Sequence, residues 1–531
     1  MAIGTTLRRT MTATVGLSAA AMMVVACTSA TDSAGSGTDE ATGLINVGDD
    51  PGEPKSGGTL AYAQYSMITD VDPAGREEGG SQGGSELAAV YDLLMRYDPE
   101  TDEYVPQLAE DLTTDDDVHW TLSLREGVTF SDDTPVDADA VLWSIERYLD
   151  KGGSHGQAWR ATVESIEATD DHTIEIVLQR PWDEFPAMLN LGPGMIVAPS
   201  SEDGDEFTPI GAGPFVIERI APGEEVSMTA REDYFGGRPH LDRLVFPHIV
   251  SERGRLDSVR SGDIEAAYLR NADTVDDALE AGEPGYAFMA SMSGVLAINQ
   301  RDGFAGADER VRRAIVAAVD PELFNDRVSD GLDLPGSEMF PDWSIWHSGA
   351  EGPAFDPDAA RELLDEAKAD GYDGRLVYLG LNDAQTQRSA QAFQTMLGAV
   401  GFDVETDLTA TMSDLVRKMY VESDYDIGFS GFNVFDQAPF IRLFANLDSA
   451  STSNALGLDD PEMDALLLDL QEAGDADAKR AVLADIQELV DQTAPFSAVT
   501  SRRLLTVWNP QTHKITPTLD GILLFDKAWV E

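Results

Sequence analysis

The chain carries a single cysteine, Cys27, among its 531 residues. A disulfide within the chain would need two cysteines, and the CxxC motifs of zinc and redox sites need at least as many. Hydrophobic cores must therefore hold the fold, and a hydrophobic share of 42% is sufficient to build them. Because a chain of this length exceeds what one compact core sustains, we expect about three domains.

The residues before Cys27 explain why it stands where it does. Arg8 and Arg9 give the chain a positively charged start, and residues 11–26 form an apolar stretch that ends in Val-Val-Ala. This stretch is shorter than the roughly 20 residues of a membrane-spanning helix, but it suits the core of a signal peptide. The pattern resembles the bacterial lipobox, in which the cysteine is lipidated and becomes the first residue of the mature protein. We therefore predict a lipoprotein signal peptide over 1–26 and a lipid anchor on Cys27, with an ordinary secretory signal as the alternative.

Residues 27–56 have a different composition. They are rich in Ser, Thr, Gly, Asp and Pro and show no periodicity of apolar residues, which is typical of a flexible linker. We predict that this segment tethers the working domains to the cell membrane on its extracytoplasmic face.

The chain is strongly acidic, with 96 Asp and Glu residues against 36 Lys and Arg residues and a formal net charge of −60. A polyanion repels the phosphates of nucleic acids, so we expect no nucleic-acid partner. Most of this charge is expected to solvate helix faces, and attraction of cationic ligands is the alternative.

Strands and helices alternate along the rest of the chain. The stretches "VHWTLSLR" from Val118 and "HTIEIVLQR" from His172 alternate apolar and polar residues, which indicates half-buried strands. Helices are predicted where an Asp precedes an apolar stripe, after Asp137, Asp356 and Asp460. The short strands "GRLVYLGL", "FDVETDL" and "YDIGFSGF" alternate with helices, so the C-terminal half is of the α/β class.

Catalytic motifs are not found in a context that would support them. The pattern GxSxG occurs around Ser81 and Ser154, but neither serine follows the strand that the nucleophile motif requires, so we interpret both as glycine loops. No HExxH, P-loop or EF-hand spacing occurs. We therefore predict no catalytic residues, no cofactor and no metal site, with a surface-anchored hydrolase as the alternative from another class.

Several collinear stretches resemble one family, the extracellular solute-binding proteins of the peptide and nickel ABC importers (family 5). They are "GGTLAYAQYSMITDVDP" from Gly57, "LREGVTFSDDTPVDADAVLWSIER" from Leu124, "PIGAGPFVIERIAPGEEVSMTAREDYFGGRPHLDRLVF" from Pro209 and "FDPDAARELLDEA" from Phe355. Two departures stand out. Ser131-Asp132-Asp133 replaces the usual His-Asp-Gly, and Phe432 replaces a usual Trp.

The resemblance implies an α/β, two-lobed periplasmic-binding-protein-like fold (type II) with an additional inserted domain. The implied boundaries are lobe I at 57–86, 209–295 and 503–531, the inserted domain at 87–208, and lobe II at 296–502. It also implies a non-enzymatic receptor that captures peptides between the lobes and delivers them to the subunits of an ABC permease. We expect a monomer, and an oligosaccharide or a nickel complex remains an alternative solute.

The resemblance also points to ligand-binding residues. They are Tyr65, Ser293, Gly294, Leu296, Asn299, Gly431, Phe432, Asn433 and Asp436. The strand around Leu296 matches a family strand whose backbone can pair with an extended peptide. Asp436 is the one carboxylate in the turn that resembles the family's amine-binding segment. Trp343 and Trp346 are interpreted as core residues, with a place in the pocket wall as the alternative.

Overall fold

The computed structural model describes residues 42–48, 52–68, 70–75, 79–204 and 206–531, all within a compact unit that spans residues 41–531. Within these residues, twelve strands form one large sheet in the order β11-β12-β13-β2-β14-β20-β15-β19-β17-β18, with β1 beside β15 and β16 beside β20. These strands are β1 (Gly43–Ile45), β2 (Thr59–Ala63), β11 (Phe215–Ala221), β12 (Glu225–Ala230), β13 (Arg243–Pro247), β14 (Ala266–Leu269), β15 (Gly285–Ile298), β16 (Leu334–Pro335), β17 (Arg375–Leu381), β18 (Asp403–Thr409), β19 (Ile427–Ser430) and β20 (Phe496–Trp508).

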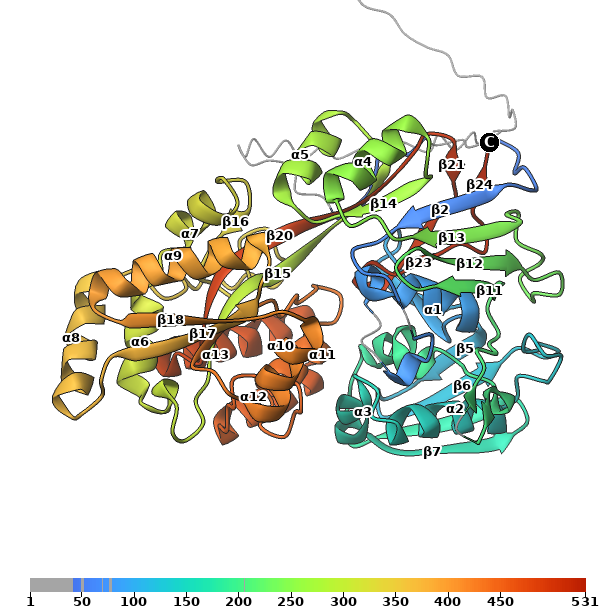
Figure 1. Ribbon diagram of the computed structural model, residues 1–531. Coiled ribbons are helices and arrows are strands. Elements are labelled where there is room, and N and C mark those ends of the chain that lie inside the picture. Colours follow the sequence, from blue (N-terminus) through green and yellow to red (C-terminus); the bar gives the residue numbers. More distant parts are fainter. Residues whose placement is uncertain (1–41, 49–51, 69, 76–78, 205) are drawn as a thin grey trace, which may run out of the picture. The chain divides into compact units, whose positions relative to one another are not determined.

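The long strands β15 and β20 connect two halves of this sheet (Figure 1). They pair antiparallel, from Gly285 opposite Val507 to Ala297 opposite Phe496. Every residue of β15 is buried, as expected of a strand with neighbours on both sides. We call the half that contains β2 and β11–β14, with the smaller sheet described below, the first lobe. The elements that lie between β15 and β20 in the chain form the second lobe.

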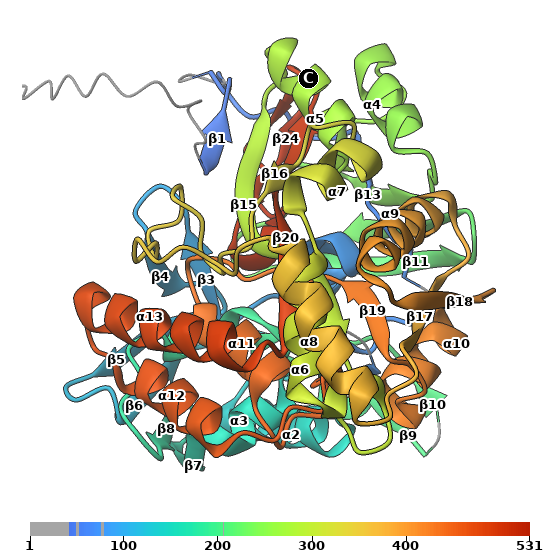
Figure 2. The ribbon, with the colours of Figure 1, turned by 90° about the vertical axis from the view of Figure 1, so that its left-hand side faces the viewer.

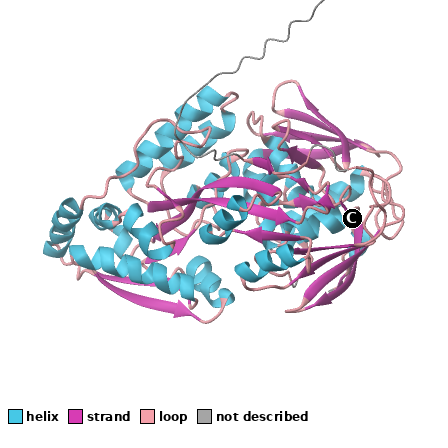
Figure 3. Ribbon diagram, turned by 90° about the horizontal axis from the view of Figure 1, so that it is seen from above, coloured by secondary structure: helices cyan, strands magenta, loops and turns pink. Residues whose placement is uncertain are grey.

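Helices surround the sheet, and they predominate at the end away from the C-terminus (Figure 3). The first lobe holds α1 (Gly84–Tyr91), α2 (Ala138–Asp150), α3 (Gly156–Thr162), α4 (Glu252–Ser261) and α5 (Ala272–Glu280). The second lobe holds α6 (Glu309–Ala318), α7 (Pro321–Val328), α8 (Pro357–Ala369), α9 (Ala384–Val400), α10 (Met412–Val416), α11 (Pro439–Leu447), α12 (Pro461–Glu472) and α13 (Ala476–Thr493).

A separate antiparallel sheet contains the two strands that alternation predicted. Its order is β5-β6-β8-β7, built from β5 (Ala109–Thr114), β6 (His119–Leu124), β7 (Val163–Asp170) and β8 (Thr173–Leu178). Trp120 of β6 lies opposite Ile176 of β8, and both are buried while His119 is exposed. The alternation of residue types therefore predicted the buried face correctly.

Four two-stranded sheets complete the described strands. They are β3 (Met95–Asp98) with β4 (Glu103–Pro106), β9 (Glu202–Asp203) with β10 (Glu206–Phe207), β21 (Thr512–His513) with β24 (Trp529–Val530), and β22 (Thr516–Pro517) with β23 (Leu523–Leu524). The last two bring the C-terminal segment back to the first lobe, where β24 lies near β2 (Figure 1).

Helix starts follow the capping rules. The carboxylate of Asp137 accepts from the backbone N–H of Ala140 at 2.9 Å, before α2. Asp356 and Asp460 do the same before α8 and α12, each followed by a proline in the first turn. A side-chain oxygen at this position satisfies amide groups that have no partner within the helix. The helices predicted after these three residues are confirmed.

The second lobe contributes to more than one hydrophobic core. Its own core lies between β17, β19 and helices α6–α9, with Phe324 and Phe393 at its centre. Helices α11–α13 instead share a core with the first lobe, since Phe440 and Leu467 belong to the same buried cluster as Trp182 and Phe185. The two lobes are therefore in contact at these helices in the described structure.

The predicted tether is wrong in one part. Residues 43–45 form β1, which pairs antiparallel with Gly285–Ala287 of β15, and Asn46 Nδ2 donates to the Glu283 carbonyl at 3.1 Å. Strand pairing through the backbone needs no apolar periodicity. The three residues of β1 therefore gave no sign of a strand in the composition of the segment. The signal peptide over 1–26 and Cys27 lie outside the described residues. Of the helices in the part that is described, none is long and apolar enough to cross a bilayer.

Candidate functional site

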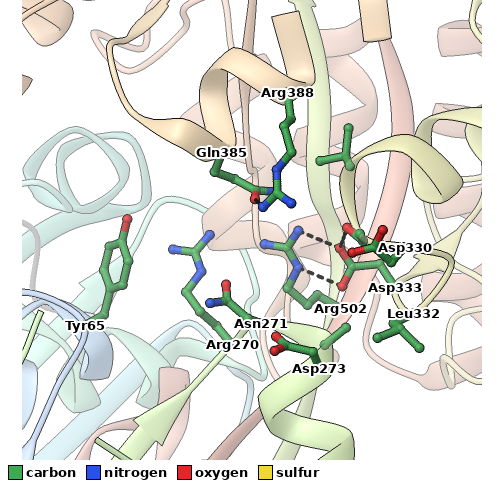
Figure 4. Close-up of a pocket in the computed structure, with 13 residues that line it drawn as sticks. Tyr65, Arg270, Asn271, Asp273, Asp330, Leu332, Asp333, Gln385, Arg388 and Arg502 are labelled. Atoms are coloured by element: carbon green, nitrogen blue, oxygen red, sulfur yellow. Dashed lines mark hydrogen bonds and ion pairs between the residues drawn. The ribbon is translucent and has the colours of Figure 1, made fainter. Parts of the chain in front are cut away.

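A pocket of about 330 Å³ lies between the two lobes (Figure 4). The first lobe supplies Tyr65 and residues 270–273, the second lobe supplies parts of 328–333 and the start of α9, and Arg502 of β20 lies between them. The lining residues are Tyr65, Arg270, Asn271, Ala272, Asp273, Val328, Ser329, Asp330, Leu332, Asp333, Gln385, Arg388 and Arg502.

Strand ends bring the first-lobe residues together. β2 and β14 are parallel neighbours, with Ala266 opposite Tyr62, so the residues that follow both strands emerge at the same edge of the sheet. Tyr65 follows β2 and Arg270 follows β14. Ligands of open α/β sheets bind at this carboxyl edge, and the pocket therefore occupies the expected place for a binding site.

Arg270 and Arg388 face the same space from opposite lobes (Figure 4). The Arg270 guanidinium lies over the Tyr65 ring, 4.5 Å from its centroid, and Arg388 Nη2 donates to Gln385 Oε1 at 2.6 Å. Among the residues that the structure describes, neither guanidinium has a carboxylate within salt-bridge distance. Such cations are notable in a chain with 96 acidic residues, and they give the pocket two donors for an anionic group.

The third arginine of the pocket is already neutralised. Arg502 donates to Asp333 through Nη2 at 2.8 Å and Nε at 3.2 Å, and the Ser329 hydroxyl donates to the same carboxylate at 2.7 Å. Asn325 holds the backbone of Asp333 on the other side. This network connects β20 to the loop after α7, so it fixes the wall of the pocket.

Tyr65 is the one predicted ligand-binding residue that lines this pocket, and 46% of its surface is exposed. Four others lie on or just after β15 and have structural contacts instead. Leu296 is fully buried in the second-lobe core, and Asn299 Nδ2 donates to the carbonyls of Ser423 and Tyr425. The Ser293 hydroxyl donates to the Ala290 carbonyl, and a Cβ on Gly294 would overlap the Thr500 side chain.

The expectation that the strand around Leu296 offers its backbone to a peptide is wrong for Val295–Ala297. These residues pair with β19 on one side and with β20 on the other. Both edges are thus occupied by the chain itself, and β-augmentation needs a free edge. The sequence could not reveal this, because the partner strands come from residues more than a hundred positions away.

The turn over 431–436 follows β19 and lies beside Ser291 of β15, on the edge of β15 that faces away from β20. Phe432 is buried, and its ring meets that of Phe496 edge to face. Gly431 is exposed, and Asn433 adopts a positive φ of 50°. The Asp436 carboxylate accepts from the Ser344 hydroxyl at 2.7 Å and from the Ile345 N–H at 3.1 Å. Burial raises its pKa, and those two hydrogen bonds offset only part of that effect.

Trp346 is buried, and its Nε1 donates to the Asp436 carbonyl at 2.8 Å. Trp343 is half-buried, and neither tryptophan lines the pocket. Trp346 therefore has the core role that was predicted, and it holds the turn that carries Asp436. This turn is separate from the pocket that Arg270 and Arg388 define.

The serines of the two GxSxG patterns lie in turns. Ser81 belongs to a short 3₁₀ turn over Gly80–Gln82, and Ser154 lies between α2 and α3. The glycine-loop interpretation is confirmed for both. Within the described ranges, no group of three His, Cys, Asp or Glu side chains is placed to hold a metal ion.

Residues 103–452 match the family described as bacterial extracellular solute-binding proteins, family 5 Middle. The chain belongs to this family. As a family 5 solute-binding protein it has an extracytoplasmic role, and the alternative of a surface-anchored hydrolase is not supported by this membership.

Individual proteins and structures agree with the family. The probable di/tripeptide-binding protein 5 of Pseudomonas aeruginosa is 26% identical over 475 residues, which are 82% of this chain and 89% of that protein. The periplasmic binding protein DppA from Helicobacter pylori, in complex with peptide STSA, has a TM-score of 0.76 at 22% identity and covers 90% of this chain and 99% of its own. NikA from Brucella suis, in complex with Fe(III)-EDTA, has a TM-score of 0.72 at 23% identity and covers 89% of this chain and 100% of its own.

These likenesses confirm the predicted two-lobed periplasmic-binding-protein-like fold with its additional domain. Sequence reasoning did not find Arg270 and Arg388 in the pocket of this solute-binding protein. The sequence feature that could have indicated a pocket role for Arg270 is its position directly after the buried strand in "AAYLRN". Arg388 had no local signal, because an arginine on the first turns of an amphipathic helix is ordinary surface chemistry.

Proposed function

We propose that this protein captures peptides in the pocket between its lobes and delivers them to an ABC permease. The observation that carries the proposal is the pair of guanidinium groups, Arg270 and Arg388, that reach the pocket from the two lobes without a carboxylate partner in the described part of the chain. A guanidinium binds a carboxylate through two parallel hydrogen bonds. The C-terminal carboxylate of a peptide is a ligand group of that kind.

The proposed lobe boundaries are 57–86, 209–295 and 503–531 for lobe I, 87–208 for the inserted domain and 296–502 for lobe II. Arg270 and Arg388 belong to different lobes in this division. A carboxylate held by both would therefore stabilise the approach of the two lobes, as in other hinge-closing receptors. Closure would bury the ligand and present a surface to the permease.

The relatives support peptides as the solute, since one is named a di/tripeptide-binding protein and one structure holds a tetrapeptide. The complex of NikA with Fe(III)-EDTA keeps a metal chelate as the second candidate, because such a chelate also presents carboxylates to arginines. An oligosaccharide would leave both guanidinium groups without an anion when closure of the lobes buries them, and a buried unpaired charge is unfavourable.

The proposed function is tested by native mass spectrometry of the protein purified from its own host. We expect bound masses that fragment as short peptides. Calorimetry with a mixture of dipeptides and tripeptides should then show binding, while a neutral trisaccharide should give no heat. Bound chelated metal without any peptide would contradict the proposal.

Asp436 lies outside the pocket that Arg270 and Arg388 line, and we propose that it binds the amino terminus of a peptide long enough to extend beyond that pocket. It is a half-buried carboxylate with a raised pKa and with no cation beside it in the described structure, so an ammonium group would supply the missing counter-charge. We expect Asp436→Asn to weaken binding of a free-amine peptide by about 2 kcal/mol, roughly thirtyfold.

N-acetylation of the peptide should weaken its binding to the wild type by a similar factor and should add little in the variant, because both changes remove one interaction. Calorimetry on the four combinations measures this. Equal affinity of variant and wild type for the free-amine peptide would mean that Asp436 only anchors the loop through Ser344 and Ile345.

The membrane anchor on Cys27 is also a proposal. We expect Cys27→Ala to abolish incorporation of radioactive palmitate and to move the protein from the membrane fraction to the medium or to an unprocessed precursor. The apolar stretch and the preceding Val-Val-Ala motivate this. Unchanged labelling of the variant would contradict it.

Size-exclusion chromatography with light scattering checks the expected monomer.

A further inference from the structure

A buried lysine joins the lobes outside the pocket. Lys479 of α13 donates to both carboxylate oxygens of Asp183 at 2.8 and 2.9 Å and to Glu184 at 2.6 Å. Its side chain is only 6% exposed. Asp183 and Glu184 belong to the first lobe, in the loop between β8 and the 3₁₀ turn Phe185–Asn190, 296 and 295 residues away in sequence. We call Lys479, Asp183 and Glu184 the clasp.

Further contacts between the lobes surround the clasp. The rings of Trp182 and Phe440 meet edge to face with centroids 5.1 Å apart, and both side chains are buried. Arg180 pairs with Glu472 at 2.5 Å, and Gln157 hydrogen-bonds to the backbone of Ala450 and Thr452. Figures 1 and 2 both place α11–α13 beside the part of the first lobe that holds α3.

The chain passes between the lobes through β15 and β20. Contacts at α11–α13 are therefore not imposed by connectivity, and they must break when the lobes move apart. On opening, water replaces the partners of all three charged groups of the clasp. In the closed arrangement, by contrast, the two carboxylates depend on Lys479, because partly buried charges of one sign repel each other when their counter-charge is absent.

We infer that Lys479 is a positioning residue for ligand retention, which holds the lobes closed through Asp183 and Glu184 without touching the solute. This inference rests on the proposed closure of the lobes and not on the identity of the ligand. Loss of the lysine should penalise the closed form alone, since the carboxylates are solvated when the lobes are apart. We expect the ratio of closed to open molecules to fall by roughly tenfold or more.

The test measures the distance between the lobes without any ligand. In Cys27→Ser protein, spin labels are attached at Glu167→Cys on β7 and Glu362→Cys on α8, both exposed positions. Double electron–electron resonance then gives the distance distribution at pH 8. This pH is chosen because burial raises the pKa of Glu184 to about 7. We expect Lys479→Met to shift the distribution from short to long distances.

Arg147→Met is the matched control. Arg147 is a buried cation that also binds two carboxylates, Asp72 at 2.6 and 2.8 Å and Glu202 at 2.8 Å, but all three lie in the first lobe. Its loss should lower the Tm and leave the distances unchanged. Neutralising the whole clasp, with Lys479→Met, Asp183→Asn and Glu184→Gln together, should restore short distances in part.

The outcomes separate the alternatives. If Lys479→Met lowers the Tm as Arg147→Met does while the distances stay as in the wild type, the clasp only stabilises the fold and the inference is wrong. Should Lys479→Met fail to fold, Lys479→Arg and Asp183→Asn are measured in its place. Short distances in Lys479→Arg together with longer distances in Asp183→Asn would support the clasp. Unchanged distances in both variants would overturn it. Because no peptide is added, failure of the peptide proposal would leave these results unaffected.

Discussion

Replacing Arg270 and Arg388 together by Gln should weaken binding of a free-carboxylate peptide by about 3 kcal/mol, roughly a hundredfold. Each guanidinium offers charge-assisted hydrogen bonds to the ligand, and Gln keeps a donor while it removes the charge. The exposure of Arg388 reduces its share, because solvent screens an exposed charge. Calorimetry with one dipeptide measures the loss.

The same dipeptide with an amidated C-terminus is the second arm of this experiment. Amidation should weaken binding to the wild type comparably and should matter little for the double variant, since both changes remove the same interaction. Arg361→Gln on α8 is the control, an exposed arginine paired with the exposed Asp358, and it should bind both peptides as the wild type does. If the double variant binds the free-carboxylate peptide with wild-type affinity, the pocket does not hold the carboxylate.

The stability of the protein should fall as the pH rises through 7, and Asp92 should account for about 3 kcal/mol of that change between pH 5 and pH 8. Asp92 follows α1 and is only 1% exposed. Burial raises its pKa to about 7, although the Tyr234 hydroxyl donates to it at 2.7 Å. The folded state therefore binds the proton more tightly than the unfolded state, whose carboxyl has the ordinary value near 4.

The direction in which stability changes with pH follows from that difference in proton binding. Below about pH 4 both states are protonated and Asp92 contributes nothing, whereas above pH 7 the folded state must bury a carboxylate that the unfolded state leaves in water. Asp92→Asn should remove this contribution and make the protein more stable at pH 8. Asn has the same shape as Asp, so it should adopt the backbone conformation of Asp92, with φ 60° and ψ −173°, at no added steric cost.

Urea unfolding at several pH values between 5 and 8 measures the effect as the difference between wild type and variant. Glu362→Gln at an exposed site on α8 is the control and should leave the pH dependence unchanged. A variant whose stability follows the same pH curve as the wild type would show that Asp92 is not the group that titrates.

The sequence determined those features whose signals lie within a few residues of one another. Alternation in "HWTLSL" predicted a strand with Trp120 buried, and Asp356 followed by Pro357 predicted the start of a helix. Both predictions are confirmed because strand faces and helix caps depend on neighbours along the chain. The collinear family stretches added the two-lobed fold. Tyr65, predicted to bind the ligand, lines the pocket because it lies two residues after the core strand β2, and its role in binding stays a prediction.

The tertiary structure alone decided which charges meet. With 96 acids and 36 basic residues, composition cannot show which arginines lack a partner, and Arg270 and Arg388 become a pair only because β14 ends and α9 begins at the same pocket. Lys479 meets Asp183 across 296 residues, and both edges of Val295–Ala297 are closed by β19 and β20. The physical reason is common to all three: ion pairing and strand pairing act over a few ångströms in space, and no local pattern in the chain records which distant segments folding brings within that range.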